Sequence, residues 1–356
     1  MIPSRGTTAK NGMRRWRVFR FAGRPVIAVP DSPNLTEVAL ASLKPFTPKR
    51  VAYQRALRVA TGLGLNRVFS TLTTQPLVDH PDFDVPAWLA EIEETLGLAR
   101  LDAVLVWPPQ RDRGRVYVHL IDHHARAHAF AKVSLSPAND DAIQREHAAL
   151  VEMAKRNLQE SRVPRVYTAA RSQGFEFMVL EAIPEAARPL GASVEAFPMD
   201  AVEEYAGAPY RLKAGNWDSL SWWNRYSASA PDQRQFDDAL RAAISHEGLR
   251  VRRVHGDFCR ANLLGDHTRT WILDWEESCA DGPAFLDELS FAMDVGFRWN
   301  ASDPRGSVKR FQAQYLRGQE WQSRHAVHTA DVLAAVAFMC SIGKVAATGL
   351  VQHWGD

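Results

Sequence analysis

The chain has 356 residues, of which 46% are hydrophobic and 24% are charged, and its formal net charge is +2. This length and composition suit a globular protein with two lobes and exclude a disordered or fibrous chain. A net charge so close to zero gives no indication of a nucleic-acid partner, and three cysteines without a CxxC pair are too few for a disulfide framework.

The N-terminal segment bears on the location of the protein. Residues 1–11 are polar and lack the apolar core of a signal peptide, and the longest uncharged run, Val332–Gly343, is too short to span a bilayer. We therefore expect a cytoplasmic protein with reduced thiols, and we interpret Val332–Gly343 as a buried helix.

Residues 1–98 are expected to form an α/β extension ahead of the catalytic part. The runs Trp16–Phe21 and Pro25–Val29 predict a hairpin, because both are rich in strand-forming residues and surround a short turn. A helix is expected from about Pro86 to Leu96, where Gly97 ends it.

The extension is rich in basic residues. Seven of them precede the first acidic residue, Asp31, and five more lie on or near a helix expected from about Pro48: Lys49, Arg50, Arg55, Arg58 and Arg67. One interpretation is a peripheral contact with anionic lipid or with an anionic substrate. The other is a solvated helix face, which the sequence favours because the apolar side of this helix is mostly Ala and Val.

Between residues 99 and 183 the pattern becomes that of a small sheet with one helix. Three runs rich in apolar and β-branched residues predict an antiparallel meander: Ala103–Trp107, Val116–Ile121 and Ala129–Leu135. A helix capped near Asn139 follows, and two further strands end at Pro184, where we expect a hinge. Residues 184–356 are expected to be mostly helical.

The motif His255-Gly256-Asp257 begins the most informative part of the sequence. Asn262 follows Asp257 by five residues, and Asp274 lies twelve residues further on. Phosphoryl transfer needs a carboxylate that orients and deprotonates the acceptor hydroxyl, and an amide oxygen and a second carboxylate that hold Mg²⁺ on the nucleotide phosphates. The catalytic loop of protein kinases has the same spacing, with arginine in place of Gly256. The sequence therefore predicts a kinase, in which His255 fixes the loop.

Lys132 lies in an apolar strand and needs a partner. Burying an unpaired ammonium group is costly, so its side chain must reach solvent, a salt bridge or a phosphate site. Glu146, fourteen residues later on the apolar side of the following helix, is the expected partner, with Glu152 as a weaker candidate. The alternative is a lysine on an edge strand without a functional role.

Together these features resemble the aminoglycoside phosphotransferase and choline kinase family over about residues 100–295. The resemblance implies an α+β, bilobal, protein-kinase-like fold, with a small antiparallel-sheet N-lobe that contains one helix and a mostly helical C-lobe. With the N-terminal α/β extension, the expected domains are 1–98, 99–183 and 184–356.

The resemblance also implies ATP and Mg²⁺ as cofactors and a role for individual residues. Asp257 is the catalytic base, and Asn262 and Asp274 ligate Mg²⁺. Nucleotide contacts are implied for a further set of residues: Lys132, Glu146, Leu180, Glu181 and Ala182. In this set the lysine contacts the α- and β-phosphates, Glu146 orients it, and the hinge backbone binds adenine.

Two features depart from the protein-kinase pattern. The loop Pro108–Gly114 contains one glycine, so either Arg111, Arg113 or Arg115 supplies charge to the phosphates, or the loop is a solvated basic turn. Glu276 occupies the place of a glycine, and no Ala-Pro-Glu segment follows, which argues against a protein kinase regulated by an activation loop.

The acceptor is the least determined part of the prediction. Trp217, Trp222, Trp223 and Tyr226 suit the apolar faces of a sugar, but also a hydrophobic core, which the sequence favours. Residues 181–250 hold eleven acidic and seven basic residues, too even a balance for a pocket that binds a polycation. We therefore expect a small hydroxylated acceptor such as a sugar or glycan precursor. The alternatives are an aminoglycoside, a protein substrate, or a catalytically silent nucleotide-binding scaffold.

Overall fold

The computed structural model divides into two compact units, each described here by itself. The first comprises residues 1–143 and 166–185, and the second comprises residues 144–165 and 186–356. The structure describes residues 15–21, 23–42, 48–74, 82–98, 100–108, 114–122, 124, 126–212, 216–217, 219–229, 234–266, 268–300, 302–316 and 327–345.

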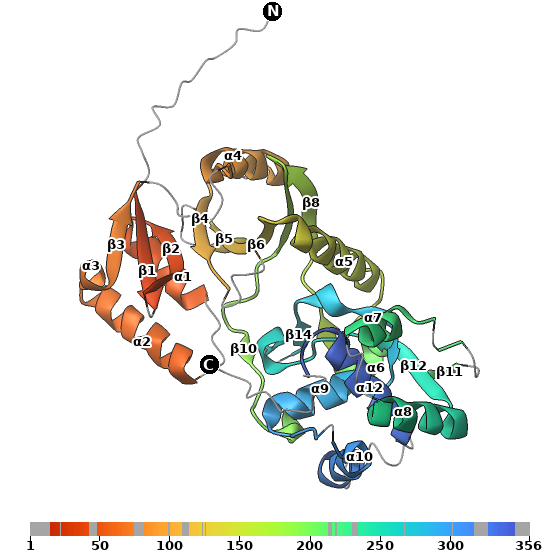
Figure 1. Cartoon of the computed structure of the whole chain (residues 1–356). Helices are drawn as coiled ribbons and strands as arrows, with labels where there is room; N and C mark the ends of the chain where they lie inside the picture. The colour runs from red at the N-terminus through yellow and green to blue at the C-terminus, as the bar shows by residue number, and fades with distance from the viewer. Residues whose placement is uncertain are drawn as a thin grey trace, which may run out of the picture. The chain divides into compact units, whose positions relative to one another are not determined.

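The first unit is built on an eight-stranded sheet with the strand order β3-β1-β2-β4-β5-β6-β9-β8 (Figure 1). All of its neighbouring strands are antiparallel. The strands are β1 (Trp16–Phe21), β2 (Arg24–Pro30), β3 (Ser70–Thr73), β4 (Asp102–Val106), β5 (Arg115–Ile121), β6 (Ala127–Ser134), β8 (Val166–Ser172) and β9 (Phe175–Glu181).

The predicted hairpin and the predicted meander are both confirmed. Strand β1 pairs with β2, and β4, β5 and β6 follow one another in the sheet. Strand β2 also pairs with β4 through Ile27–Val106 and Ala28–Leu105. The strands of the N-terminal extension therefore continue the sheet of the expected N-lobe.

The helices of this unit are α1 (Pro33–Ser42), α2 (Pro48–Gly62), α3 (Asn66–Phe69) and α4 (Val85–Leu96). Helix α4 packs in one core with the sheet, and α1 and α2 pack in another. Successive residues of β4 pack in different cores, because the side chains of a strand point alternately to the two faces of the sheet. Ala103 and Leu105 pack in a core with Trp88 of α4, whereas Val104 packs in a core with Leu57 of α2.

Helix α4 matches its predicted limits. Asp84 caps the first turn by accepting a hydrogen bond from the backbone N–H of Ala87 at 3.2 Å. Gly97 ends the helix with φ 64°, a left-handed conformation that glycine adopts without strain. Trp88, Leu89 and Ile92 are buried on one side, as the spacing predicts.

The second unit is mostly helical, as expected. Its helices are α6 (Met199–Ala206), α7 (Ser221–Ser229), α8 (Arg234–Glu247), α9 (Leu286–Val295), α10 (Pro304–Phe311), the π-helix η5 (Gln312–Leu316) and α12 (Thr329–Ser341). Two small sheets accompany them, with orders β10-β13-β14-β7 and β11-β12-β15. Their strands are β7 (Ser161–Arg162), β10 (Arg188–Pro189), β11 (Tyr210–Leu212), β12 (Leu249–Val254), β13 (Leu263–Gly265), β14 (Thr270–Ile272) and β15 (Cys279–Pro283).

Helix α12 lies at the centre of this unit. Every residue from Ala330 to Met339 is buried, which confirms the buried helix expected from the uncharged run. The aromatic cluster of Trp217, Trp222, Trp223 and Tyr226 packs in the same core, so its interpretation as core is confirmed. No helix in the described part of the chain combines the length and the apolar character needed to cross a bilayer.

The two units separate between Glu185 and Ala186, close to the hinge expected at Pro184. Helix α5 (Pro137–Met153) begins in the first unit and continues into the second, so residues 144–165 belong with the helical unit. The α+β class and the contrast between an antiparallel-sheet unit and a mostly helical unit are therefore confirmed.

Candidate active site

The segment between β12 and β13 forms the predicted catalytic loop and ends in the 3₁₀ turn η3 (Arg260–Asn262). Its second residue, Gly256, has φ 89°, and a Cβ atom there would lie 2.3 Å from the backbone oxygen of Glu277. A side chain is excluded by both strain and collision. This is the physical reason for glycine where protein kinases have arginine.

Asp287, the second residue of α9, holds the beginning of the loop. Its carboxylate accepts hydrogen bonds from the backbone N–H groups of His255 at 2.8 Å and Gly256 at 3.0 Å, and from the Tyr205 hydroxyl at 2.7 Å. Asp287 is fully buried. The sequence prediction missed this residue, although an acidic pair opening an apolar helix was a signal for it.

His255 fixes the loop in the way expected from the sequence. Its ring is buried, its Nε2 atom lies 2.8 Å from the backbone oxygen of Leu273, and its centroid is 4.8 Å from the ring of Trp275. Burial lowers the pKa of the imidazole, so the neutral form is favoured. His255 therefore ties the loop to the segment that carries Asp274.

A β-hairpin brings the two expected Mg²⁺ ligands to one end. Strands β13 and β14 pair in register, and the N–H of Leu273 donates to the backbone oxygen of Asn262 at 2.9 Å. The Asn262 amide nitrogen donates to the backbone oxygen of Asp257 at 2.9 Å, so its amide oxygen is the atom it offers to a cation. Asp274 has φ 65°, an uncommon conformation that recurs at functional sites.

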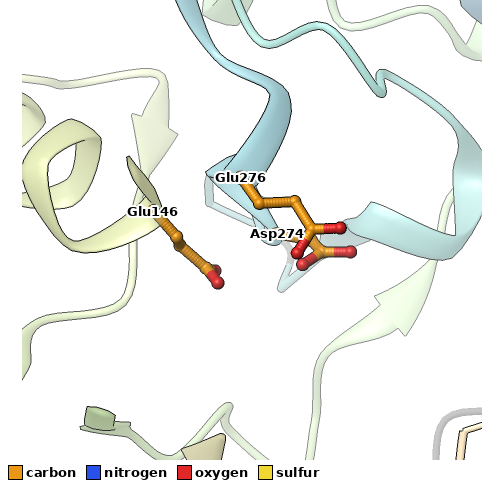
Figure 2. A group of neighbouring side chains, drawn as sticks. All are labelled: Glu146, Asp274 and Glu276. Carbon is orange, nitrogen blue, oxygen red and sulfur yellow. The ribbon is translucent and has the colours of Figure 1, made fainter. Parts of the chain in front are cut away.

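Three carboxylates converge beside this hairpin. Figure 2 shows Glu146 from α5 pointing toward Asp274 and Glu276, which lie at the start of the 3₁₀ turn η4 (Trp275–Glu277). One oxygen of each carboxylate lies within 4.8 Å of the others, and both glutamates are buried. Arg145 Nε donates to the backbone oxygen of Glu276 at 3.1 Å, which holds the two segments together.

This donor set fits Mg²⁺. Magnesium prefers oxygen ligands and is usually bound through one or two carboxylates together with nucleotide phosphates and water. Asp274 and Asn262 were expected as ligands, whereas Glu276 was noted only as a departure from protein kinases and Glu146 only as a partner of Lys132. The structure adds both glutamates to the candidate metal centre.

Lys344, just beyond α12, contacts the predicted base. Its ammonium group forms an ion pair with the Asp257 carboxylate and donates to the Ser290 hydroxyl at 3.1 Å. The lysine side chain is 10% exposed and that of Asp257 is 28% exposed. Burial lowers the pKa of Lys344 to about 7. Its separation from the motif in the sequence left no local pattern that predicted this contact.

Lys132 lies in the first unit, on strand β6 between β5 and β9. It is 6% exposed, and its Nζ atom is 5.9 Å from the ring centroid of Tyr117, its cross-strand neighbour. The edge-strand alternative is therefore wrong. Glu152 contacts Arg253 and Arg156, which disfavours it as the partner. The pairing of Lys132 with Glu146 stays a prediction, because the two residues belong to different units.

The remaining expected site residues have mixed outcomes. Leu180 is buried in β9, and Glu181 and Ala182 are half-buried at its end; their contact with adenine stays a prediction.

Arg111 and Arg113 lie outside the described residues. Arg115 is buried, and its Nε atom donates to the Asn139 side-chain oxygen at 3.0 Å.

Cys259 follows the base by two residues and is shielded. Burial raises the pKa of its thiol to about 12. The thiolate is the reactive form of cysteine, so this residue is expected to be inert.

Comparisons with known proteins identify the family of this chain. A sequence model described as the phosphotransferase enzyme family matches residues 114–327. No curated protein matches the chain.

Solved structures similar to this chain include three phosphotransferase relatives. A choline/ethanolamine kinase family protein from Mesorhizobium loti is 17% identical with a TM-score of 0.39, covering 64% of this chain and 73% of that one. The GDP complex of a mutant aminoglycoside 2′-phosphotransferase-IIIa is 12% identical with a TM-score of 0.43, covering 72% and 89%. A streptomycin–ATP complex of APH(2″)-IIa is 11% identical with a TM-score of 0.36, covering 72% and 98%.

Proposed function

Because this chain belongs to the phosphotransferase enzyme family, we propose that it is an ATP- and Mg²⁺-dependent kinase of a small hydroxylated molecule. The proposed reaction transfers the γ-phosphate of ATP to a hydroxyl of a sugar-like or glycan-precursor acceptor. The acceptor oxygen forms the new bond to phosphorus, the bond to the β-phosphate oxygen breaks, and ADP leaves.

The observation that supports this proposal best is that Asp257 and Asn262 lie in one loop, which several hydrogen bonds hold in place. The Asn262 side chain is bound to the backbone of Asp257, and Asp287 holds the backbone that precedes it. Asp257 would orient the acceptor hydroxyl and take its proton late in the reaction. Such a base needs accurate placement more than high basicity, because positioning and charge neutralisation supply most of the rate.

Mg²⁺ bound with ATP would neutralise the charge of the β- and γ-phosphates. In this chain Asn262 and Asp274 would hold it, with Glu276 and Glu146 close enough to contribute. Lys132 would contact the α- and β-phosphates from the sheet unit, and the backbone of Glu181 and Ala182 would bind adenine. These nucleotide contacts are proposed from the family pattern.

The ion pair between Lys344 and Asp257 favours an acceptor that is not a polycation. An ammonium group beside the base repels the amino groups of an aminoglycoside, whereas it tolerates neutral hydroxyls and attracts anionic substituents. A sugar or glycan precursor is therefore the proposed acceptor, ahead of an aminoglycoside.

A coupled assay of ADP formation tests the proposal. The full chain is incubated with ATP and Mg²⁺ and with panels of sugars, nucleosides, amino alcohols and aminoglycosides, and phosphorylated products are identified by mass spectrometry. Asp257→Asn is the control for background hydrolysis. We expect acceptor-dependent ADP release with a sugar-like compound, lost in the control.

Three results would contradict parts of this proposal. Turnover confined to aminoglycosides would replace the proposed acceptor class. Transfer of radiolabel to lysate proteins, with no small molecule active, would indicate a protein kinase. ATP binding without turnover on any panel would indicate a catalytically silent scaffold.

A further inference from the structure

Large apolar side chains are unusually exposed at one place in the first unit. Of the nine large hydrophobic residues exposed in the described chain, six lie between residues 59 and 72. We call these six the apolar patch: Val59, Leu63, Leu65, Val68, Phe69 and Leu72. Single exposed apolar residues are normal, whereas six within fourteen consecutive positions suggest an interaction surface.

The apolar patch extends from the end of α2 through a turn at residues 63–65 and α3 to β3. Leu63 donates through its backbone to Val59 at 3.0 Å, and Leu65 donates to Ala60 at 2.7 Å, which ties this turn to the end of α2. Helix α3 runs directly into β3, which pairs with β1 (Figure 1). The side chains of Leu63 and Val68 are nevertheless 68% and 73% exposed.

Helix α2 therefore has two apolar sides with different uses. Leu57 is 3% exposed and packs in the core between α2 and the sheet, which also contains Val104. Val59 and Leu63 lie one turn apart on the other side, in line with Arg55, which is also exposed. Among the described residues of this unit, none buries Val59 or Leu63, so these side chains can contact a surface outside the unit.

Exposed basic side chains lie on α2, the helix that leads into the apolar patch. The sequence between Glu37 and Asp79 has no acidic residue and contains six basic ones: Lys44, Lys49, Arg50, Arg55, Arg58 and Arg67. Of these, Lys49, Arg55 and Arg58 are exposed on α2, and none has an ion-pair partner among the described residues. Arg20 and Arg24 add positive charge at the tip of the β1–β2 hairpin, which Tyr53 of α2 contacts by donating to the Arg20 backbone oxygen at 2.7 Å.

We propose that the apolar patch, together with Lys49, Arg55 and Arg58 of α2, forms a surface that binds a bilayer containing anionic phospholipids. Exposed apolar side chains would enter the headgroup region, and the arginines beside them would bind lipid phosphates. This combination of charge and apolar exposure outweighs the solvated-helix interpretation, because Val59 on α2 is followed directly by the exposed Leu63 in the turn and Phe69 in α3. The proposal is independent of the kinase reaction.

Vesicle flotation with the full chain tests this surface. The probes are vesicles of phosphatidylcholine alone and of phosphatidylcholine mixed with phosphatidylglycerol, at low and high salt. We expect binding to the mixed vesicles that weakens with salt, and little binding to phosphatidylcholine. Leu63→Ser with Phe69→Ser, or Arg55→Glu with Arg58→Glu, should each weaken binding roughly tenfold or more, since each basic residue near an anionic surface contributes roughly fivefold.

Matched variants elsewhere on the chain separate this surface from general effects. Val151→Ser replaces an exposed apolar residue of α5, and Arg269→Glu with Arg305→Glu makes the same change of net charge on the second unit. These controls should bind vesicles like the natural chain, and all variants should unfold at the same temperature.

The proposal is overturned if the natural chain binds neither vesicle type. It is equally overturned if the Leu63/Phe69 and Arg55/Arg58 variants bind vesicles as well as the controls do. It is also overturned if the apolar patch joins two copies of the chain. That outcome would appear as a dimer in light scattering that the Leu63 and Phe69 changes dissociate, without any effect on vesicle binding. Acceptor phosphorylation measured without vesicles reports separately on the proposed kinase activity.

Discussion

Lys344 forms an ion pair with Asp257, which places an ammonium group directly on the proposed catalytic base. The lysine comes from the segment after α12 and the aspartate from the loop after β12, so only the packing of the second unit brings them together. A cation at this position can hold the carboxylate in its charged form and also lie near the phosphoryl group as it transfers.

Replacing Lys344 tests that relationship. Lys344→Met should lower kcat by about 10- to 100-fold while the KM for ATP changes little, because the charge acts where the base and the transferred group meet. Lys344→Arg should retain more activity. Ser290→Ala is the control: it removes the second hydrogen bond of Lys344 but leaves the ion pair, so roughly a threefold effect is expected. An unchanged kcat in Lys344→Met would show that the ion pair has no role in turnover.

The same residue predicts a pH dependence. Burial lowers the pKa of Lys344 from 10.5 to about 7, so the ammonium form is lost as the pH rises through that value. The rate of acceptor phosphorylation should therefore fall on the alkaline side of about pH 7. Arginine stays charged at any accessible pH, so the rate of Lys344→Arg should remain level over the same range. Parallel pH–rate profiles for the two proteins would contradict this prediction.

Gly256 is expected to tolerate no side chain. In Gly256→Ala the new methyl group meets the backbone oxygen of Glu277, and the residue must also keep φ 89°. We expect a loss of about 3 kcal/mol or more in the free energy of unfolding, together with a large loss of kcat. Gly174→Ala is a matched control, because Gly174 has φ 87° with nothing within 4 Å of a Cβ atom. It should lose only about 1 kcal/mol in urea denaturation.

Replacing Asp287 is expected to lower both the free energy of unfolding and kcat. In Asp287→Asn one oxygen acceptor is replaced by an amide donor that faces the N–H of either His255 or Gly256, so about 2–4 kcal/mol of unfolding free energy should be lost. The kcat should fall as well, because the loop carries the base. Tyr205→Phe removes one donor to the same carboxylate and should cost about 1 kcal/mol, with kcat largely kept. Equal effects of the two changes would sink the idea that Asp287 acts through the loop backbone.

The acidic cluster predicts an altered requirement for Mg²⁺. Asp274→Asn should abolish turnover, and Glu276→Gln should raise the Mg²⁺ concentration needed for half-maximal rate by roughly tenfold. Glu277→Gln is the neighbouring control, since that side chain instead faces Arg225 at 3.5 Å. Titration of Mg²⁺ at fixed ATP measures all three. A shift in Glu277→Gln as large as that in Glu276→Gln would remove Glu276 from the metal centre.

Features set by neighbouring residues were predictable from the sequence. The limits of α4 follow from Asp84, Pro86 and Gly97, which act on the helix ends themselves. The paired strands β4, β5 and β6 follow from their alternating and β-branched residues. The fixed spacing of Asp257, Asn262 and Asp274 could be read in the same way, because a single loop and a single hairpin connect them.

Features that depend on packing between distant segments could not be predicted in this way. The contact of Lys344 with Asp257, the support of the loop by Asp287 and the position of Glu276 beside Glu146 each join separate elements. The exposure of Val59 likewise depends on which side of α2 packs on the sheet, where Leu57 is buried. The sequence thus determined which residues could perform phosphoryl transfer. Burial and tertiary contacts decided which charges surround them, since the strength of an electrostatic interaction depends on distance and solvent exposure, and folding fixes both.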